Sequence, residues 1–74
     1  MKEGDALQRA MMALLRDRFY TGYKKYIEQG YYPIRDREVM QDIYEQYHRL
    51  GGNGVISHLK EEMDELPTYM NEEH

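Results

Sequence analysis

Apolar residues recur at spacings of three and four along most of the chain, which is the periodicity of amphipathic helices. Three segments show this pattern, and we expect helices over about 6–29, 37–50 and 54–66. No stretch alternates apolar and polar residues for long with the period of two that marks a half-buried strand. The pattern therefore predicts an all-α fold, a small three-helix domain with one long N-terminal helix and a helical hairpin.

The first segment carries recognisable end signals. Asp5 is a suitable N-cap, and Gln8, three residues later, completes a pattern like a capping box. Gly30 and Pro33 follow the segment, as they do after many helices. Gly22 lies inside and costs about 1 kcal/mol relative to alanine; such a glycine often marks the close approach of another backbone. The apolar stripe of this helix comprises Leu7, Met11, Leu14, Leu15, Phe19, Tyr23, Tyr26 and Ile27.

The second and third segments also have end signals. Asp36 is expected to cap a helix that begins near Arg37, and Gly51 to end it. Asn53 is expected to cap the third helix, and Pro67 to stop it. The inner residues of these helices are expected to be Val39, Met40, Ile43, Tyr44, Tyr47 and Leu50, then Val55, Ile56, Leu59, Met63 and Leu66. Residues 67–74 are predicted to form an acidic flexible tail after a single domain, 1–66.

The predicted helices differ in length. At 1.5 Å per residue the first spans about 36 Å and the others about 20 Å each. If the two short helices fold back as a hairpin, they cover only part of the first and leave an apolar stripe exposed: Leu7, Met11, Leu14 and Leu15. Such a stripe normally meets a partner, and the two-fold dimer is the commonest assembly. We therefore predict a homo-oligomer, a dimer or larger, through these residues. An end-to-end arrangement of the short helices would weaken this argument.

Composition supports self-association. A domain of 74 residues buries a modest core and usually needs a further staple. The absence of cysteine excludes disulfides and zinc–thiolate sites, and the three histidines form no cluster in the sequence. We therefore expect neither a metal nor a cofactor. The sequence shows no signal peptide and no apolar run of ~20 residues, so we expect a soluble cytoplasmic protein that does not bind membranes.

The net charge of −4 is unevenly distributed. Residues 1–37 carry eight Lys/Arg and five Asp/Glu, whereas residues 38–74 carry two and nine. The basic half suits contact with the acidic half, within or between chains. The acidic half argues against direct binding to duplex DNA, which needs a basic face, and would suit docking on a basic surface.

Three glycines surround Asn53 between the second and third helices. Glycine allows a sharp turn, and it leaves amide hydrogens uncovered at the start of the next helix. The corner is therefore either a tight connection or a site for a phosphate or carboxylate. It is not a P-loop, because the required spacing and the Lys-Ser/Thr pair are missing. As an anion or nucleotide site it would use Arg49, Gly51, Gly52, Asn53 and Gly54, with Tyr31, Tyr47 and His48 as further contacts.

Eight tyrosines accompany one phenylalanine and no tryptophan. A tyrosine joins a flat apolar ring to a hydroxyl, so it fills wet cores and also stacks on bases. Most are expected to pack the first helix on the second, whereas Tyr31 and Tyr32 are the least explained by a core. The basic residues either form a solvated face that pairs with nearby acids or hold phosphates: Arg16, Arg18, Lys24, Lys25, Arg35 and Arg37.

Catalysis is not indicated. His48 could act as a base, but no nucleophile or second acid accompanies it in the sequence. His58 and Glu62 share a helix face and are too few to ligate a metal. The acid-rich run 60–65 is either a solvated face or a docking surface for a basic partner. We therefore expect a protein that is not an enzyme.

Several segments carry a family likeness: Leu14-Leu15-Arg16-Asp17-Arg18, Gly22-Tyr23, Gly30-Tyr31, Tyr44-Glu45-Gln46-Tyr47-His48-Arg49-Leu50-Gly51-Gly52-Asn53-Gly54 and Leu66-Pro67-Thr68. In these segments the chain resembles small proteins of tailed phages and prophages of Gram-positive bacteria. The resemblance covers about residues 7–68. It implies a viral origin and no catalytic residue. Small phage proteins of this kind often inhibit host factors, sequester ligands, or form minor parts of the virion or lysis module.

These observations lead to a hypothesis of function. The chain would be a non-enzymatic, phage-encoded homo-oligomer that counters host defence in the host cytoplasm. One version sequesters a phosphate-bearing signalling nucleotide at the glycine corner. The other docks the acidic helices on a host defence protein and blocks it. The alternative is a minor structural, assembly or lysis-module protein of the phage.

Overall fold

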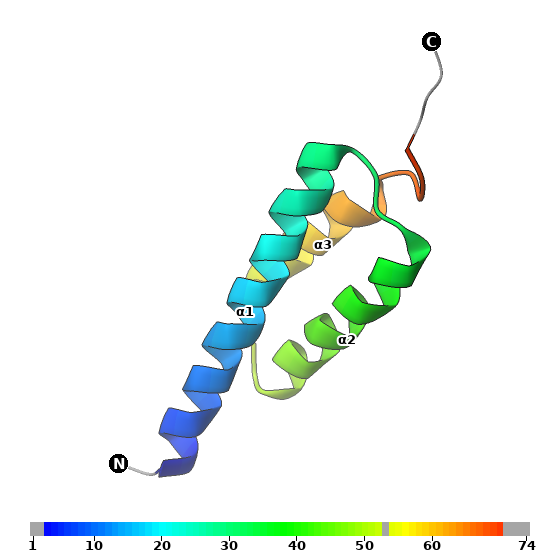
Figure 1. Cartoon of the computed structure of the whole chain (residues 1–74). Helices are drawn as coiled ribbons and strands as arrows, with labels where there is room; N and C mark the ends of the chain where they lie inside the picture. The colour runs from blue at the N-terminus through cyan, green and yellow to red at the C-terminus, as the bar shows by residue number, and fades with distance from the viewer. Residues whose placement is uncertain (1–2, 53, 71–74) are drawn as a thin grey trace.

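A computed structural model describes residues 3–52 and 54–70 of the chain. These residues form three α-helices: α1 (Glu3–Gln29), α2 (Ile34–Arg49) and α3 (Val55–Asp64). α2 runs back alongside α1, and α3 returns along the direction of α1 (Figure 1). The predicted all-α fold with a helical hairpin is therefore confirmed, and the short helices do not lie end to end.

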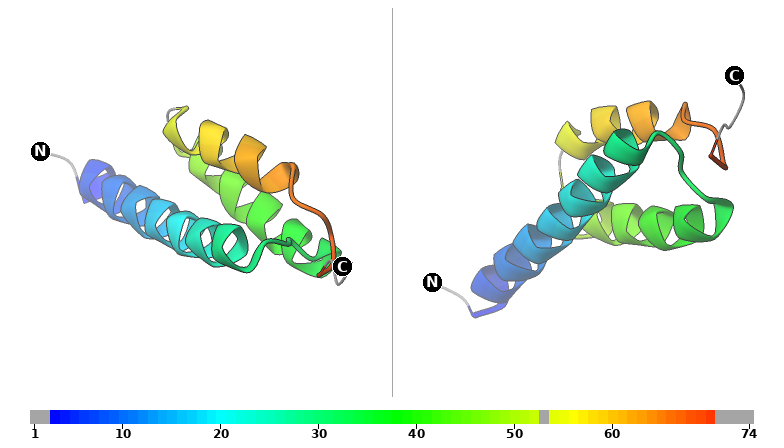
Figure 2. Two further views of the ribbon diagram at one scale, coloured as in Figure 1. Left: turned by 90° about the horizontal axis from the view of Figure 1, so that it is seen from above. Right: turned by 45° about the horizontal axis from the view of Figure 1, so that its top comes forward.

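α1 is the central helix, because both α2 and α3 pack on it. At 1.5 Å per residue, α1 is about 40 Å long, α2 about 24 Å and α3 about 15 Å. The molecule is accordingly elongated, with extents of 58 × 17 × 16 Å. Figure 2 shows the N-terminal end of α1 extending past both other helices. α1 is thus enclosed toward its C-terminus and open toward its N-terminus.

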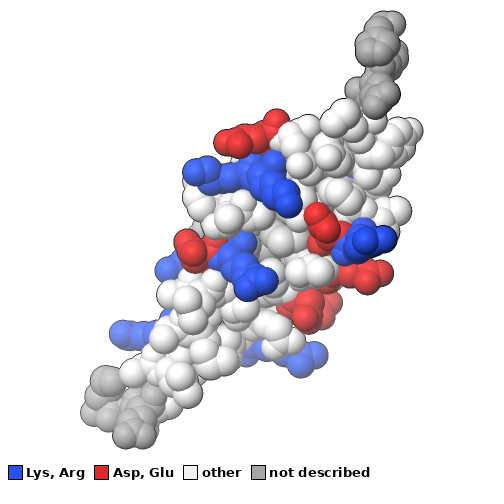
Figure 3. Space-filling model, viewed as in Figure 1, with Lys and Arg blue, Asp and Glu red and all other residues white. Residues whose placement is uncertain are grey.

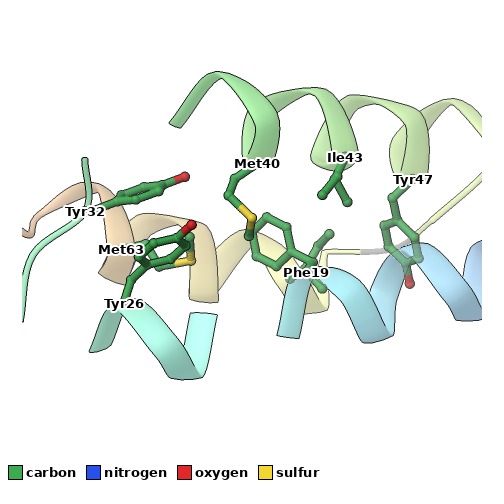
Figure 4. Packing of buried hydrophobic residues seen from close by; sticks show 8 residues of the cluster. Phe19, Tyr26, Tyr32, Met40, Ile43, Tyr47 and Met63 are labelled. Atoms are coloured by element: carbon green, nitrogen blue, oxygen red, sulfur yellow. The ribbon is translucent and has the colours of Figure 1, made fainter. Parts of the chain in front are cut away.

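The core is a row of aromatic, methionine and isoleucine side chains between the three helices (Figure 4). Phe19 of α1 and Met63 of α3 are fully buried at its centre. The other core residues are Tyr26, Tyr32, Met40, Ile43, Tyr47 and Ile56. Tyr32, which the sequence analysis leaves unexplained, is a core residue with 2% of its surface exposed. The core therefore accounts for more of the tyrosines than the helical pattern indicated.

Two helix starts differ from the predicted ones. α1 begins at Glu3, so Asp5 lies inside the helix and is not its N-cap. Gln8 does not complete a capping box, since its side-chain Nε2 donates to the carbonyl of Leu50 at 2.6 Å. α2 begins at Ile34 and not near Arg37. The extended Pro33 (φ −61°, ψ 147°) leads directly into the helix, and its carbonyl accepts the Arg37 amide at 3.0 Å.

The consequence for Asp36 is a change of role. It lies in the first turn of α2, where a carboxylate is favourable near the positive end of the helix dipole. Its side chain is not a cap, and it accepts a hydrogen bond from the Tyr26 hydroxyl at 2.8 Å. The residue that was expected to start the helix therefore ties α2 to α1.

The end of α3 also differs from the predicted one. The helix ends at Asp64, two residues early, and the amides of Glu65 and Leu66 close its last turn with bonds three residues back. Pro67, the first residue of the predicted tail, accepts the amide of Tyr32 at 2.8 Å. This bond fastens the start of the tail to the α1–α2 loop. The predicted cap Asn53 and residues 71–74 of the tail lie outside the described residues.

Gly22 accommodates a side chain and not another backbone. A Cβ placed on Gly22 would lie 2.7 Å from Cε of Met40. The missing side chain therefore lets the methionine of α2 lie against the backbone of α1, which brings the two helices close at this level.

Candidate functional site

The glycine corner ends α2 with a Schellman motif. Gly51 adopts a positive φ of 96°, and its amide donates to the carbonyl of His48 at 2.9 Å. The amide of Gly52 donates to the carbonyl of Tyr47, also at 2.9 Å. These are the two bonds that define the motif. The amides of Gly51 and Gly52 are consequently engaged by the end of α2.

The other two glycines of the corner have different roles. Gly52 has no positive φ, but a Cβ there would collide with the ring of Tyr47. The residue must be small because the tyrosine ring packs against its backbone. Gly54 meets nothing within 4 Å, and its carbonyl accepts the Ser57 amide at 3.1 Å in the first turn of α3. Packing and capping therefore explain Gly51 and Gly52 without a ligand.

The residues proposed as nucleotide contacts do not form one cluster. Tyr47 is 2% exposed, so its ring cannot stack on a base in this conformation. Tyr31 lies on the α1–α2 loop, at the opposite end of α2 from the corner and about 24 Å away along the helix. His48 and Arg49 are exposed near the corner, and the His48 ring lies 4.6 Å from that of Tyr44. Asn53 lies outside the described residues.

Three tyrosine hydroxyls join the three pairs of helices. The pairs are Tyr26 with Asp36 at 2.8 Å, Tyr23 with Glu62 at 2.6 Å, and Tyr44 with Ser57 at 2.8 Å. Burial and the bond to Asp36 raise the pKa of Tyr26, and the bond to Glu62 raises the pKa of Tyr23. Both hydroxyls therefore stay protonated at neutral pH and donate to their carboxylates.

The basic residues are used in several different ways. Arg37 stacks 4.4 Å from the centre of the Tyr32 ring and donates to the carbonyls of Tyr32 and Leu66 at 2.9 and 2.8 Å. Lys24 and Lys25 lie over the rings of Tyr20 and Tyr26. Arg16, Arg18 and Arg35 are exposed. Within the described part of the chain, the ion pair present is Lys60 with Asp64 in α3. Among those residues, the basic half and the acidic half therefore form no ion pair with each other.

The N-terminal half of α1 exposes large apolar side chains. Leu7, Met11 and Leu14 are 63, 43 and 71% exposed, and we call these three residues the α1 face. Leu15, which was predicted to belong with them, is partly buried and packs against the core. At 100° per residue, Leu15 and Phe19 point toward α2, whereas the α1 face is centred about 90° away. α1 therefore carries two apolar faces, and the expected single stripe is wrong.

The α1 face is exposed because α2 packs on a different flank of α1, more than because α2 is short. α2 extends along α1 as far as Gln8, whose side chain reaches Leu50. It thus runs beside the α1 face without covering it. The shorter α3 lies on the other flank of α1, where Val55, Ile56 and Leu59 lie near Tyr20 and Ala13. Uncharged surface between basic side chains is visible over the lower part of α1 (Figure 3).

A hollow of about 290 Å³ adjoins the α1 face at the seam between α1 and α2. It is lined by Met11, Leu14, Leu15, Gln46 and Leu50. Val39 precedes Gln46 by two helical turns, so it lies on the same side of α2, and it is 53% exposed. The helical pattern predicted that Val39 and Leu50 would lie in the core. Their spacing of eleven residues with Gln46 between them puts the three residues on one side of α2, but it does not show that this side is uncovered.

Acidic side chains gather on the outer surface of α2 and the end of α3. A second hollow, of about 500 Å³, is lined by Tyr32, Ile34, Arg37, Glu38, Gln41, Asp42, Glu45 and Asp64. Among residues 3–52 and 54–70, no three His, Cys, Asp or Glu side chains gather closely enough to hold a metal ion. The surface is therefore an acidic face, and the described residues supply no metal cluster.

Comparison of the chain with known proteins identifies no relative. No protein-family model, curated protein or solved structure matches the chain. Among the described residues, none of the helices has both the length and the apolar content needed to cross a membrane.

Proposed function

We propose that this chain is a non-enzymatic, phage-encoded binding protein that self-associates through α1 and counters host defence by docking on a host protein. The observation that carries the proposal is the exposure of the α1 face. Leu7 and Leu14 are each more than 60% exposed on a domain of 74 residues. Apolar side chains that lie together on the surface of a small protein normally mark an interaction site. The phage origin rests on the resemblance described above.

The protein-blocking version has more support than the nucleotide version. A nucleotide site at the corner would need free amides and an accessible ring. The amides of Gly51 and Gly52 are engaged, Tyr47 is buried, and Tyr31 lies at the other end of α2. We therefore propose that the target is a protein and that the phosphate of a nucleotide is not the group bound.

The acidic outer surface is the proposed contact with the host protein. Glu61 of α3 and Glu65, which directly follows α3, are exposed, as are Glu38 and Glu45 of α2. No partner inside the described residues neutralises these carboxylates, whereas Glu62 is engaged by the Tyr23 hydroxyl. A surface of one charge favours a partner of the opposite charge and speeds their encounter. A basic patch on a host defence protein fits this surface.

The test is phage plating on host strains that each carry one defence system, with and without the chain. We expect the chain to raise plating on at least one strain. The double variant Glu61→Lys/Glu65→Lys should lose this effect. The matched control Asp17→Lys/Glu28→Lys changes the net charge equally at exposed positions of α1 and should keep it.

Two outcomes would overturn the proposal. One is no change of plating on any strain, together with recovery of the chain in purified virions, which would favour a structural or assembly role. The other is retained activity in the Glu61→Lys/Glu65→Lys variant, which would remove the acidic surface of α3 as the contact.

A further inference from the structure

We infer that a second copy of this chain docks on a two-helix face, with α1 of each copy lying against α2 of the other. The face, called here the α1/α2 face, combines the α1 face with the adjacent edge of α2: Leu7, Met11, Leu14, Val39, Gln46 and Leu50. The inference rests on the proposed function, because it specifies the surface through which the chain self-associates. It assigns α2 a part in the contact.

Size favours two helices over one. The exposed stripe from Leu7 to Arg18 is about 16 Å long, and a helix with its side chains is about 10 Å wide. This footprint falls well below the roughly 800 Å² per partner of a standard interface. Adding the edge of α2 from Val39 to Leu50, which is also about 16 Å long, doubles it. Of the two arrangements, the one that uses both helices therefore comes closer to the size of a standard interface.

Shape favours a second copy as the occupant. A two-fold contact requires one patch that carries both a protrusion and a matching recess. The α1/α2 face carries both, because Leu14 is 71% exposed and borders a hollow of about 290 Å³. A leucine side chain is a suitable size for such a recess. Leu14 of another copy can thus fill this hollow.

The levels of the residues along the helices give the orientation. Gly22 of α1 lies opposite Met40 of α2. Counting along the antiparallel pair, Leu14 is at the level of His48, midway between Gln46 and Leu50. A two-fold axis parallel to the helices preserves these levels and can set α1 of each copy against α2 of the other. Leu14 of one copy then enters the hollow of the other beside Gln46 and Leu50, and the four long helices form an antiparallel bundle with α3 outside.

Charge supports the same orientation. Arg18 lies beside the α1 face, and Asp42 lies one turn from Val39 on α2. Both are exposed, and neither forms an ion pair within the described residues. Their levels along the helix pair differ by two residues, or about 3 Å. Because α1 of each copy lies against α2 of the other, each arginine comes near the aspartate of the other copy.

Cysteine cross-linking tests the arrangement, since the chain has no cysteine of its own. Leu14→Cys and Gln46→Cys are made in separate chains and mixed in equal amounts under mild oxidation. We expect cross-linked dimer in the mixture and little in either variant alone. Dominant cross-linking of Leu14→Cys with itself would overturn the inference, because it would place α1 on α1, although self-association would stand.

A charge exchange gives a second measurement. Arg18→Asp and Asp42→Arg should each weaken the dimer about 5-fold, because each puts like charges together twice. The double variant should recover most of the wild-type affinity, and Ile34→Asp, at an exposed apolar position outside the face, should dimerise normally. A double variant weaker than both single variants would refute the pairing. A wild-type chain that is monomeric by light scattering at all accessible concentrations would refute the self-association in the proposed function as well.

Discussion

The two halves of α1 differ in what surrounds them. Around Phe19 and Tyr26 the helix is enclosed by α2 and α3, and these two side chains are at most 6% exposed. Around Leu7 and Met11 only the end of α2 lies alongside, and the apolar side chains face outward. The same three-and-four spacing runs through both halves. Hydrophobic periodicity therefore indicates an apolar face, but it does not show whether the chain itself covers that face.

The largest expected difference between the two halves is in stability. Phe19→Ala removes a fully buried ring from the centre of the core and should lower the free energy of unfolding by about 3–5 kcal/mol. Leu14→Ala changes an exposed side chain and should stay within about 0.5 kcal/mol. Urea unfolding followed by circular dichroism measures both. The protein concentration must be low enough that dimerisation adds nothing. Similar losses in the two variants would contradict the comparison.

The enclosed region should also give the molecule its sensitivity to alkali. Burial raises the pKa of Tyr32 to about 12, from an ordinary value of 10.0. Between these pH values the Tyr32 hydroxyl loses its proton in the unfolded chain before it does so in the folded one, so the free energy of unfolding falls as pH rises. Tyr32 contributes at most about 1.4 kcal/mol per pH unit to this fall. Below about pH 9 this contribution is constant. The unfolding free energy at pH 9, 10 and 11 measures the decline.

Tyr32→Phe is the control for this effect. Phenylalanine keeps the ring in the core and removes the ionisable hydroxyl, so the decline should become shallower. Some slope should remain, because the pKa of Tyr26 is also raised by burial. An unchanged slope in Tyr32→Phe would assign the alkali sensitivity to other groups.

The glycine corner offers a smaller, local version of the comparison. Gly52→Ala would force a methyl group into the Tyr47 ring and should cost about 1–3 kcal/mol. Gly54→Ala meets open space at a negative φ and should lie within about 0.5 kcal/mol of the wild type. The melting temperatures of the two variants, compared side by side, show whether position 52 requires glycine because of the Tyr47 ring or only for backbone flexibility. Equal effects would mean that the Tyr47 contact does not determine the requirement for glycine at position 52.

The sequence predicted the helices better than it predicted their surroundings. Number, order and approximate bounds of the helices follow from periodicity and from Gly30, Pro33 and Gly51. The role of Tyr32 does not, because it depends on the bond of its amide to the carbonyl of Pro67, which lies far along the chain. Tertiary contacts of this kind leave no local signal.

The candidate site shows the same limit. Leu7, Met11 and Leu14 are exposed as predicted, whereas Leu15 is partly buried, and the cause of the exposure differs from the predicted one. The predicted helix lengths suggested that α2 would stop short of this part of α1, whereas α2 reaches Gln8 and runs along the neighbouring flank. Helical rotation separates Leu14 from Leu15 by 100°, and only the placement of α2 decides which of the two is covered. The contribution of Val39 and Gln46 could not be found without that placement.

The smallest expected effect concerns the link between the open half of α1 and the rest. Gln8 is exposed, and its amide group donates to the carbonyl of Leu50 at 2.6 Å, just before the Schellman turn. Gln8→Ala should change global stability by no more than about 0.5–1 kcal/mol, since alanine favours the helix and the lost bond is solvent-accessible. Local opening should increase instead, because this bond is one of few that hold the end of α2 to α1. Amide hydrogen exchange of Gly51 and Gly52 should therefore become faster, while exchange near Phe19 stays unchanged. Equal acceleration in both regions would mean that the halves open as one unit, and the contrast between them would then be one of exposure alone.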